Sequence, residues 1–213
     1  MNNNKSIITV KNLVKKFGDF VANDNLCFEI REGEIFGFLG ANGAGKTTAI
    51  RILCGLSYPT SGDISIAGLD IYTQRDEIKR RIGYMSQKFS LYEDLTVAEN
   101  IEFYGGIYGV RGARFRERRE WILEMAGLAD RENSITGELS TGWKQRLALG
   151  CAVLHEPPIL FLDEPTSGLD PEASLTVRNY LLDLKKEGRT IFLNTHNLDE
   201  ATRLCDRVGV MKT

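Results

Sequence analysis

The sequence predicts an α/β fold built around a mainly parallel β-sheet. Short β-rich runs alternate along the 213-residue chain with longer stretches of helical periodicity, which is typical of a parallel sheet covered by helices. The runs at 34–39 and 159–162 are almost entirely apolar, as expected of strands buried on both faces. A mainly helical region at 89–155 interrupts this alternation, so we expect a helical insert in an α/β core formed by 1–88 and 156–213.

The N-terminal part of the chain is expected to begin with strands and then to form a helix after a glycine-rich turn. Apolar and polar residues alternate in the first strand, and the third ends at Gly40, where the glycines begin. A Pro-Thr-Ser-Gly cluster at 59–62 then turns the chain into a fourth strand. The expected strands are 7–13, 21–30, 34–39 and 63–67, and the expected helix is 46–56.

The C-terminal part is expected to hold the helices of the insert, followed by further strands. Helical periodicity covers 96–125 with a break near 105–112. Another helix is expected at 140–154, with Ser140 as its N-cap. β-Rich patterns return at 159–162, 190–194 and 208–211.

Composition excludes several classes of protein. The chain is 42% hydrophobic and 26% charged, as in ordinary globular domains, and its net charge of −2 gives no overall attraction for nucleic acid. No apolar run approaches the ~18 residues that a bilayer crossing needs, and residues 1–5 lead into a strand without a signal-peptide core. The four cysteines contain no CxxC pair, so we expect neither a zinc ribbon nor a disulfide scaffold but buried, reduced thiols in a cytosolic protein.

The stretch 111–120 is locally basic, with five Arg and two Glu. Two interpretations are open: a solvated helix face, or a surface for a phosphate-rich partner. Phe115 is the one aromatic residue among these arginines, and stacking on aromatic residues is what single-stranded nucleic acids require. We therefore expect a solvated face.

The segment 40–47, GANGAGKT, fits the phosphate-binding pattern G-x-x-x-x-G-K-[ST]. Glycines let consecutive backbone N–H groups turn toward a phosphate, and the helix that follows adds the positive end of its dipole. Lys46 supplies a charge for the β- and γ-phosphates, and the Thr47 hydroxyl can coordinate Mg²⁺. A purely structural glycine turn is the alternative, but the strand before and the helix after the motif favour a nucleoside triphosphate site. The expected nucleotide ligands here are Gly40, Ala41, Asn42, Gly43, Ala44, Gly45, Lys46, Thr47 and Thr48.

Two acids follow the buried strand at 159–162. The carboxyl ends of parallel strands are where α/β proteins bind ligands, so Asp163 and Glu164 are expected beside the phosphate loop. Asp163 is the candidate Mg²⁺ ligand, and Glu164 is the candidate base that polarises the attacking water. The alternative is a pair of surface acids capping a loop. His196 stands at the end of another expected strand, where either a structural role or a γ-phosphate contact is open.

With these motifs in place, the sequence closely resembles the ATP-binding cassette family, the nucleotide-binding domains of transporters. Residues 139–143, LSTGW, resemble the family signature, usually LSGGQ, and 167–170, SGLD, resemble its D-loop. Gln87 matches the Q-loop glutamine, His196 matches the switch histidine, and Phe17 matches the aromatic on which adenine stacks. The resemblance covers nearly the whole chain, and its motifs occur in the family's order.

The resemblance implies a P-loop NTPase with a RecA-like core, an N-terminal antiparallel β subdomain and a helical signature subdomain. It implies ATP hydrolysis with Mg²⁺, in which Glu164, His196, Gln87 and Lys46 are catalytic and Gln87 also reports on the metal. It further implies a head-to-tail dimer of two cassettes, homo- or heteromeric, with each ATP between one phosphate loop and the signature of the other subunit. The residues expected on that second face are Ser140, Thr141, Gly142 and Asp170.

The resemblance also implies a location and partners. The expected protein is a peripheral ATPase on the cytoplasmic face of the membrane, driving a transporter whose permease domains lie on another chain. The run 95–100 and the Thr141 variant resemble the branch that exports drugs, lipids and polysaccharides. Phe89 and Tyr92 are the candidate docking residues for a permease helix, against an alternative of ordinary core contacts.

Two departures from the family pattern stand out. Thr141 replaces the first signature glycine and Trp143 replaces the glutamine, which puts the hydrolysis rate rather than binding in question. Trp143 is expected either to contact the dimer partner or to cover the start of its helix. The chain also resembles a cassette shortened at its C terminus, because the family continues past 208–211 with another strand and more helix.

Other classes of nucleoside triphosphatase fit the sequence less well. Cassette ATPases that repair DNA carry a long coiled coil between phosphate loop and signature, and ribosome-acting members carry two cassettes in tandem; this chain has neither feature. A GTPase would carry an N-K-x-D motif for guanine, which is absent. We therefore expect a membrane transporter ATPase without a nucleic-acid partner, and a soluble cassette acting on nucleic acid or ribosomes remains the alternative.

Overall fold

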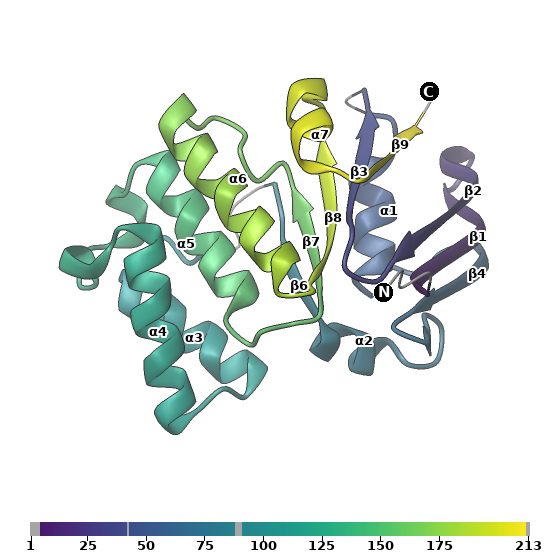
Figure 1. Cartoon of the computed structure of the whole chain (residues 1–213). Coiled ribbons are helices and arrows are strands. Elements are labelled where there is room, and N and C mark those ends of the chain that lie inside the picture. The colour runs from purple at the N-terminus through teal and green to yellow at the C-terminus, as the bar shows by residue number, and fades with distance from the viewer. Residues whose placement is uncertain (1–4, 42, 88–90, 212–213) are drawn as a thin grey trace.

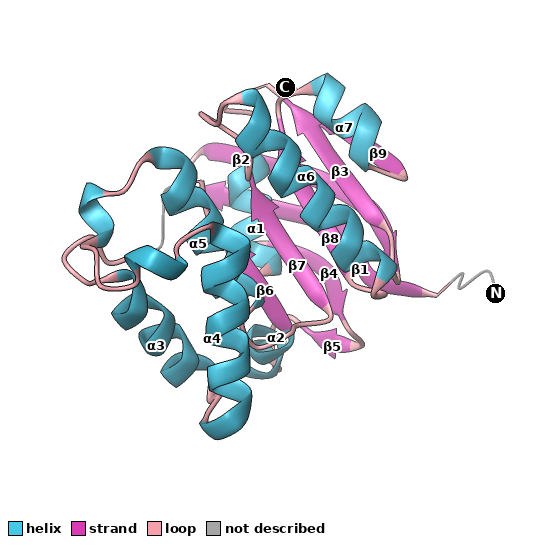
Figure 2. Ribbon diagram, turned by 60° about the vertical axis from the view of Figure 1, so that its left-hand side comes forward, coloured by secondary structure: helices cyan, strands magenta, loops and turns pink. Residues whose placement is uncertain are grey.

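The computed structural model describes residues 5–41, 43–87 and 91–211. The described part of the chain forms two β-sheets and a group of helices (Figures 1 and 2). Its strands are β1 (Ser6–Phe17), β2 (Phe20–Arg31), β3 (Ile35–Gly40), β4 (Ser61–Ile66), β5 (Leu69–Asp70), β6 (Ile82–Met85), β7 (Ile159–Asp163), β8 (Thr190–Thr195) and β9 (Arg207–Met211). Its helices are α1 (Lys46–Leu53), α2 (Arg75–Arg81), α3 (Val97–Tyr108), α4 (Gly112–Ala126), α5 (Thr141–Val153), α6 (Pro171–Lys186) and α7 (Leu198–Leu204), with 3₁₀ turns at Ala129–Arg131 and Thr136–Glu138.

The central sheet has the strand order β6-β7-β8-β3-β9, and all of its pairs are parallel. Side chains alternate between its two faces. Leu160 and Leu162 of β7 lie in the core that also holds α6, whereas Ile159 and Phe161 lie in the core that holds α1. Because β7 is buried on both faces, its sequence is a continuous apolar run, as predicted.

A second, antiparallel sheet has the order β2-β1-β4-β5 and covers the α1 side of the central sheet. Ile8 and Val10 of β1 are buried in the same core as Ile50 of α1. Figure 1 shows β1, β2 and β4 on one side of the molecule and helices α3, α4 and α5 on the other. The α/β fold with a parallel core, an antiparallel N-terminal sheet and a helical insert is therefore confirmed.

Several predicted boundaries are wrong by a few residues. The helix expected at 46–56 ends at Leu53, because Gly55 takes a left-handed backbone with φ of +68°. The expected break at 105–112 is shorter, since α3 continues to Tyr108 and ends at Gly109, which also has positive φ. Gly105 lies within α3 where α4 crosses close to it, and a Cβ there would lie 2.5 Å from the Phe115 ring.

Helices α2, α6 and α7 and strands β5 and β6 were not predicted. The α6 helix carries clear signals, with Asp170 as an N-cap that accepts from the Ala173 amide at 2.9 Å and a proline in its first turn. Its buried residues Val177, Leu181 and Leu184 follow helical spacing. The other missed elements have seven residues or fewer, too short for periodicity to be recognised.

The four cysteines are all free thiols. Cys54 and Cys151 are buried, as expected, and burial raises the pKa of both thiols. The expectation of burial is wrong for Cys27, which is exposed on β2, an edge strand, where its thiol contacts Asn12. Among the described residues, no helix combines the length and the hydrophobicity that a bilayer crossing requires.

Candidate functional site

The predicted phosphate loop joins the end of β3 to the start of α1. Gly45 precedes the helix with φ of +88°, and a Cβ at this position would lie 2.1 Å from the carbonyl oxygen of Ala22. The Asn23 amide donates to the Gly45 carbonyl at 3.1 Å and ties the loop to β2. Only glycine fits here, because both the backbone angle and the close approach of β2 exclude a side chain.

Lys46 is folded into the loop that it follows. Its ammonium donates to the carbonyls of Gly40 at 2.6 Å and Ala41 at 2.9 Å, and the side chain is almost fully buried. These carbonyls hold the charge within the turn of the loop, where the free N–H groups at the start of α1 also point. The loop therefore concentrates positive potential at one place. Asn42 lies outside the described residues.

Asp163 ends β7 beside the phosphate loop. Its carboxylate accepts from the Thr47 hydroxyl at 3.2 Å and from the Asn194 amide at 2.5 Å. Burial raises the pKa of this carboxyl, although both hydrogen bonds act in the opposite direction. A hydroxyl and a carboxylate oxygen in contact suit Mg²⁺, which takes few protein ligands and keeps several waters. This pair fits the ion, although the described residues hold no group of three or more His, Cys, Asp or Glu side chains that would form a metal site.

Glu164 has an unusual backbone for a non-glycine residue, with φ of +54°. Its side chain is buried and is held at both oxygens: Nδ1 of His196 lies 2.7 Å from one, and the Gln87 amide donates to the other at 3.1 Å. Its backbone is held as well, since its N–H donates to the Asn194 carbonyl and its carbonyl accepts from Gln145 of α5 at 3.1 Å. Strained backbone that is fixed on all sides is typical of functional positions.

A cavity of about 260 Å³ collects most of these residues. Glu164 also borders a smaller hollow of about 180 Å³ on its other side, which His196 lines with residues of the 166–168 loop. The expected residues that line the first cavity are Gly43, Gly45, Lys46, Thr47, Thr48, Gln87, Asp163 and Glu164.

Other expected residues lie beside this cavity rather than in its walls. Gly40, Ala41 and Ala44 form the strand end and the turn behind it. Phe17 is exposed and faces Phe20 across the β1–β2 turn, and Phe20 is the aromatic that lines the cavity. Ala22 and Asn194 also line it and were not predicted. An aromatic next to the phosphate loop was predictable, but which of two aromatics three residues apart lines this cavity depends on the turn.

The signature residues stand at the start of α5. The Ser140 hydroxyl accepts from the backbone N–H of Trp143 at 3.5 Å, which confirms Ser140 as the N-cap. The segment 167–170 lies alongside: Cβ atoms built at Gly142 and Gly168 would lie 3.8 Å from Leu169 and 3.7 Å from Thr141. Ser140, Thr141, Gly142 and Asp170 do not line the 260 Å³ cavity, so within one chain the signature lies apart from the phosphate loop.

Trp143 packs into the helical region. Its ring is half-buried, lies 4.3 Å from the guanidinium of Arg131 and approaches Gly127 at the end of α4. Within its own chain Trp143 therefore packs against the 129–131 turn and the end of α4.

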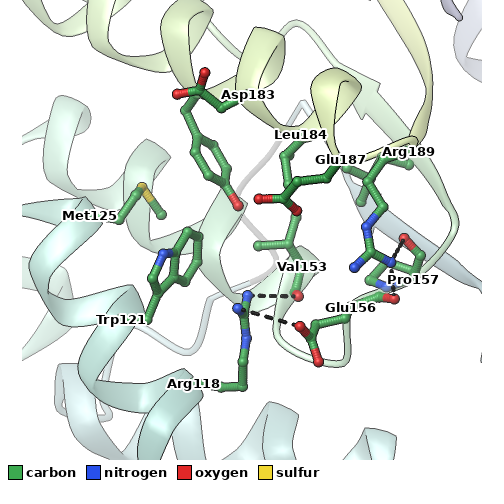
Figure 3. A pocket seen from close by; sticks show the side chains of 12 residues that line it. Arg118, Trp121, Met125, Val153, Glu156, Pro157, Asp183, Leu184, Glu187 and Arg189 are labelled. Carbon is green, nitrogen blue, oxygen red and sulfur yellow. Dashed lines mark hydrogen bonds and ion pairs between the residues drawn. The ribbon is translucent and has the colours of Figure 1, made fainter. Parts of the chain in front are cut away.

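A second cavity of about 260 Å³ lies between α4 and α6 (Figure 3). In Figure 3, Arg118 lies between Trp121 and Glu156, with its guanidinium 4.3 Å from the indole ring and 3.8 Å from the carboxylate. Arg114 also pairs with Glu156, and Arg119 pairs with Glu132. Acid partners therefore occupy three of the five arginines at 111–120, in agreement with the solvated-face interpretation. No motif predicted this cavity, because its walls come from elements far apart in sequence.

Comparison with protein families gives one match. Residues 23–167, more than half of the chain, match the family model described as ABC transporter. This segment includes the phosphate loop, Gln87, the signature and the Asp163–Glu164 pair.

Curated relatives match over nearly the whole chain. The "Probable multidrug ABC transporter ATP-binding protein YbhF" of Escherichia coli K12 is 47% identical over 97% of this chain, which spans only 36% of that protein. The "Nod factor export ATP-binding protein I" of Cupriavidus metallidurans is 39% identical over 97% of this chain and 68% of its own length. Among solved structures, a dimeric post-hydrolysis state of an ATP-binding cassette bound to ADP and Pi is 32% identical, with a TM-score of 0.87 over 96% of this chain and 94% of that one.

Proposed function

The chain belongs to the ABC transporter family, and from that premise we propose that it binds and hydrolyses ATP to power a membrane transporter, in the direction of export. The observation that carries the proposal is the arrangement at Glu164, whose carboxylate is held by His196 and Gln87 beside the phosphate loop. The names of the relatives, which include multidrug and Nod factor export proteins, favour a transporter over a soluble cassette acting on nucleic acid or ribosomes.

Each residue has a separate part in the proposed hydrolysis. The backbone N–H groups at 43–48 and the Lys46 ammonium bind the β- and γ-phosphates, while Phe20 supports the base. Thr47 and Asp163, with Gln87 nearby, would hold Mg²⁺, which neutralises developing charge on the phosphates. Glu164 accepts a proton from the attacking water, and a general base of this kind typically contributes ~10²–10⁴ in rate. His196 fixes one Glu164 oxygen, which leaves the other to Gln87 and the water.

The signature is proposed to act on ATP bound by a second cassette. It is an N-capped helix start that lies outside the chain's own nucleotide cavity, so its natural ligand is the phosphate of a facing subunit. The dimeric cassette with ADP and Pi is the precedent for this arrangement. ATP would then hold two cassettes together, and hydrolysis would release them.

Permease domains are the other proposed partner, which places this ATPase against the cytoplasmic face of a membrane. Tyr92 and Phe103 form an exposed aromatic pair with ring centroids 4.5 Å apart, and Ile107 lies exposed one turn along α3. We assign permease docking to this surface, which we call the Tyr92–Phe103 surface; Phe89 lies outside the described residues. Alanine at both positions should uncouple transport and spare basal hydrolysis, whereas equal loss of both activities would contradict the assignment.

The test of the function is size-exclusion chromatography of Glu164→Gln with and without MgATP, beside Glu117→Gln as a matched control on an exposed site. The expected result in chromatography is an ATP-dependent dimer of Glu164→Gln. In an ATPase assay of the two variants, only Glu164→Gln should lose kcat, by ~10²–10⁴-fold. Nucleotide affinity should not change, because the substitution leaves the phosphate loop and Lys46 unaltered. A protein that binds ATP but stays monomeric would overturn the two-cassette arrangement, and undiminished hydrolysis would overturn the role of Glu164.

A further inference from the structure

Two loops on either side of the helical region are joined into one unit. One loop leads from Tyr92 into α3, and the other leads through 132–137 toward α5. The backbone amides of Thr136 and Gly137 donate to the carbonyls of Leu95 and Glu93, both at 2.9 Å. The amides of Val97 and Ala98 donate in return to the Ser134 and Glu132 carbonyls, at 3.1 and 2.9 Å. We call this pairing the 92–98/132–137 ladder.

Asn100 sits at the centre of the ladder with no exposed surface. Its side-chain oxygen accepts from the backbone N–H of Tyr92 at 2.9 Å. Its Nδ2 donates to the Tyr92 carbonyl at 2.9 Å, the Thr96 carbonyl at 3.1 Å and the Thr136 hydroxyl at 3.0 Å. Burial of a carboxamide is unfavourable unless its groups are paired, and here both its oxygen and its nitrogen are. Asn100 therefore fixes the backbone of one loop against a buried side chain of the other.

The ladder has a proposed functional surface at each end. Tyr92, whose backbone Asn100 holds on both sides, supplies one ring of the Tyr92–Phe103 surface. Thr136, which is also fully buried, begins the 3₁₀ turn that leads directly to the Ser140 N-cap of the signature helix. A second tie runs in parallel, because Lys144 of α5 pairs with Glu93 at 2.9 Å. The two loops approach closely at Gly137, where a Cβ would lie 3.1 Å from the Glu93 carbonyl oxygen.

We propose that Asn100, through its bond to Thr136, is the positioning residue that makes the Tyr92–Phe103 surface and the signature move as one body. The inference rests on the proposed function, because it uses the signature as the contact to the facing subunit's ATP. A buried, fully paired polar network is stiff, so a displacement at one end reaches the other with little loss. Coupling between two binding surfaces is reciprocal, so closure on ATP must also change the docking end.

Hydrogen exchange measured by mass spectrometry on Glu164→Gln, with and without MgATP, tests this proposal. Glu164→Gln is the parent protein, into which the further substitutions are introduced. In this parent, ATP-driven closure should slow exchange of the amides at 91–97 by about fivefold or more. Thr136→Val removes the hydroxyl while keeping the shape, and Thr136→Ser keeps the hydroxyl. The expected result is loss of most of the ATP-dependent protection at 91–97 in the valine variant and its retention in the serine variant. Asn100→Leu, which removes the carboxamide and with it any hydrogen bond to Thr136, should behave like the valine variant.

The controls separate coupling from stability and from the proposed function. ATP-dependent protection at 43–53, in the phosphate loop and α1, should be the same in all variants. If Thr136→Val speeds exchange at 91–97 equally with and without MgATP, the residue is merely structural and the proposal is overturned. Full protection in both Thr136→Val and Asn100→Leu would overturn it too. A parent that stays monomeric with MgATP would instead overturn the proposed dimer, a different outcome from a dimer without protection at 91–97.

Discussion

His155 gives a stability prediction whose size can be worked out. Its ring stacks on Tyr108 of α3 with centroids 3.6 Å apart and an angle of 13°, and its Nε2 lies 3.0 Å from the Ile82 carbonyl oxygen. Burial lowers its pKa to about 4, with smaller contributions from the positive charges of Arg114 and Arg189. The folded protein therefore holds this imidazole neutral at pH values where the unfolded chain has already protonated it.

The sign and size follow from proton linkage. Because the folded pKa lies below the ordinary value of about 6.5, stability is present above pH 6.5 and is lost as the pH falls toward 4. At 1.36 kcal/mol per pKa unit the full loss is about 3 kcal/mol, of which about 2 kcal/mol falls between pH 7 and pH 5. His155→Gln removes the titration and keeps a donor for the Ile82 carbonyl.

Urea unfolding followed by tryptophan fluorescence at pH 7 and pH 5 measures this effect. Both tryptophans, Trp121 and Trp143, lie in helices α4 and α5, next to the elements that His155 contacts. Between pH 7 and pH 5, the free energy of unfolding of the wild type should fall by about 2 kcal/mol more than that of His155→Gln. The m-values should not change. If the free energies of unfolding of the two proteins change equally with pH, the reasoning is refuted, since every other titrating group is common to both.

Three further predictions concern the nucleotide site. Asp163→Asn should abolish ATPase activity yet raise the urea midpoint, and the gain should be larger at pH 7 than at pH 4. Burial raises the pKa of this carboxyl, so its charged form destabilises the fold as the pH rises; an equal gain at both pH values would contradict this. Gly45→Ala should lower the free energy of unfolding by about 1 kcal/mol or more, because the added Cβ would clash with the Ala22 carbonyl. It should also eliminate ATP binding in nucleotide titrations. Phe20→Ala should weaken ATP binding by ~1–3 kcal/mol and Phe17→Ala by less. The reverse order would show that adenine stacks on Phe17 instead.

Local sequence signals were enough to predict strands β3, β7, β8 and β9 of the central sheet and the polar residues at its edge. Runs such as 159–162 are unambiguous because a strand buried on both faces must be apolar throughout. The phosphate loop and the acids that follow β7 were predictable because each is a contiguous motif, and parallel strands bring their carboxyl ends to one edge. The register of β7 with β8, which sets Asp163 opposite Asn194, completes that edge.

Features that depend on contacts distant in sequence were not predictable. Phe20 lines the cavity while Phe17 lies across the β1–β2 turn from it, and no local pattern separates the two aromatics. The left-handed backbone of Glu164 arises from bonds to Asn194 and Gln145, which belong to other elements. Asn100 falls in the helical pattern predicted for 96–125, and its burial depends on the packing of 132–137 against 92–98.

The bond between Gln145 and Glu164 has a consequence for cooperativity. Gln145 belongs to α5, whose first turn is proposed to contact the ATP of the facing subunit, yet its amide holds the Glu164 and Pro165 carbonyls of its own subunit, at 3.1 and 2.8 Å. In the proposed dimer, each signature helix thus contacts one nucleotide and holds the general base that activates the water for attack on the other. The two ATP sites would then be coupled reciprocally, so ATP binding at one site should change the rate of hydrolysis at the other. The ATPase rate should therefore depend on ATP concentration with a Hill coefficient above one.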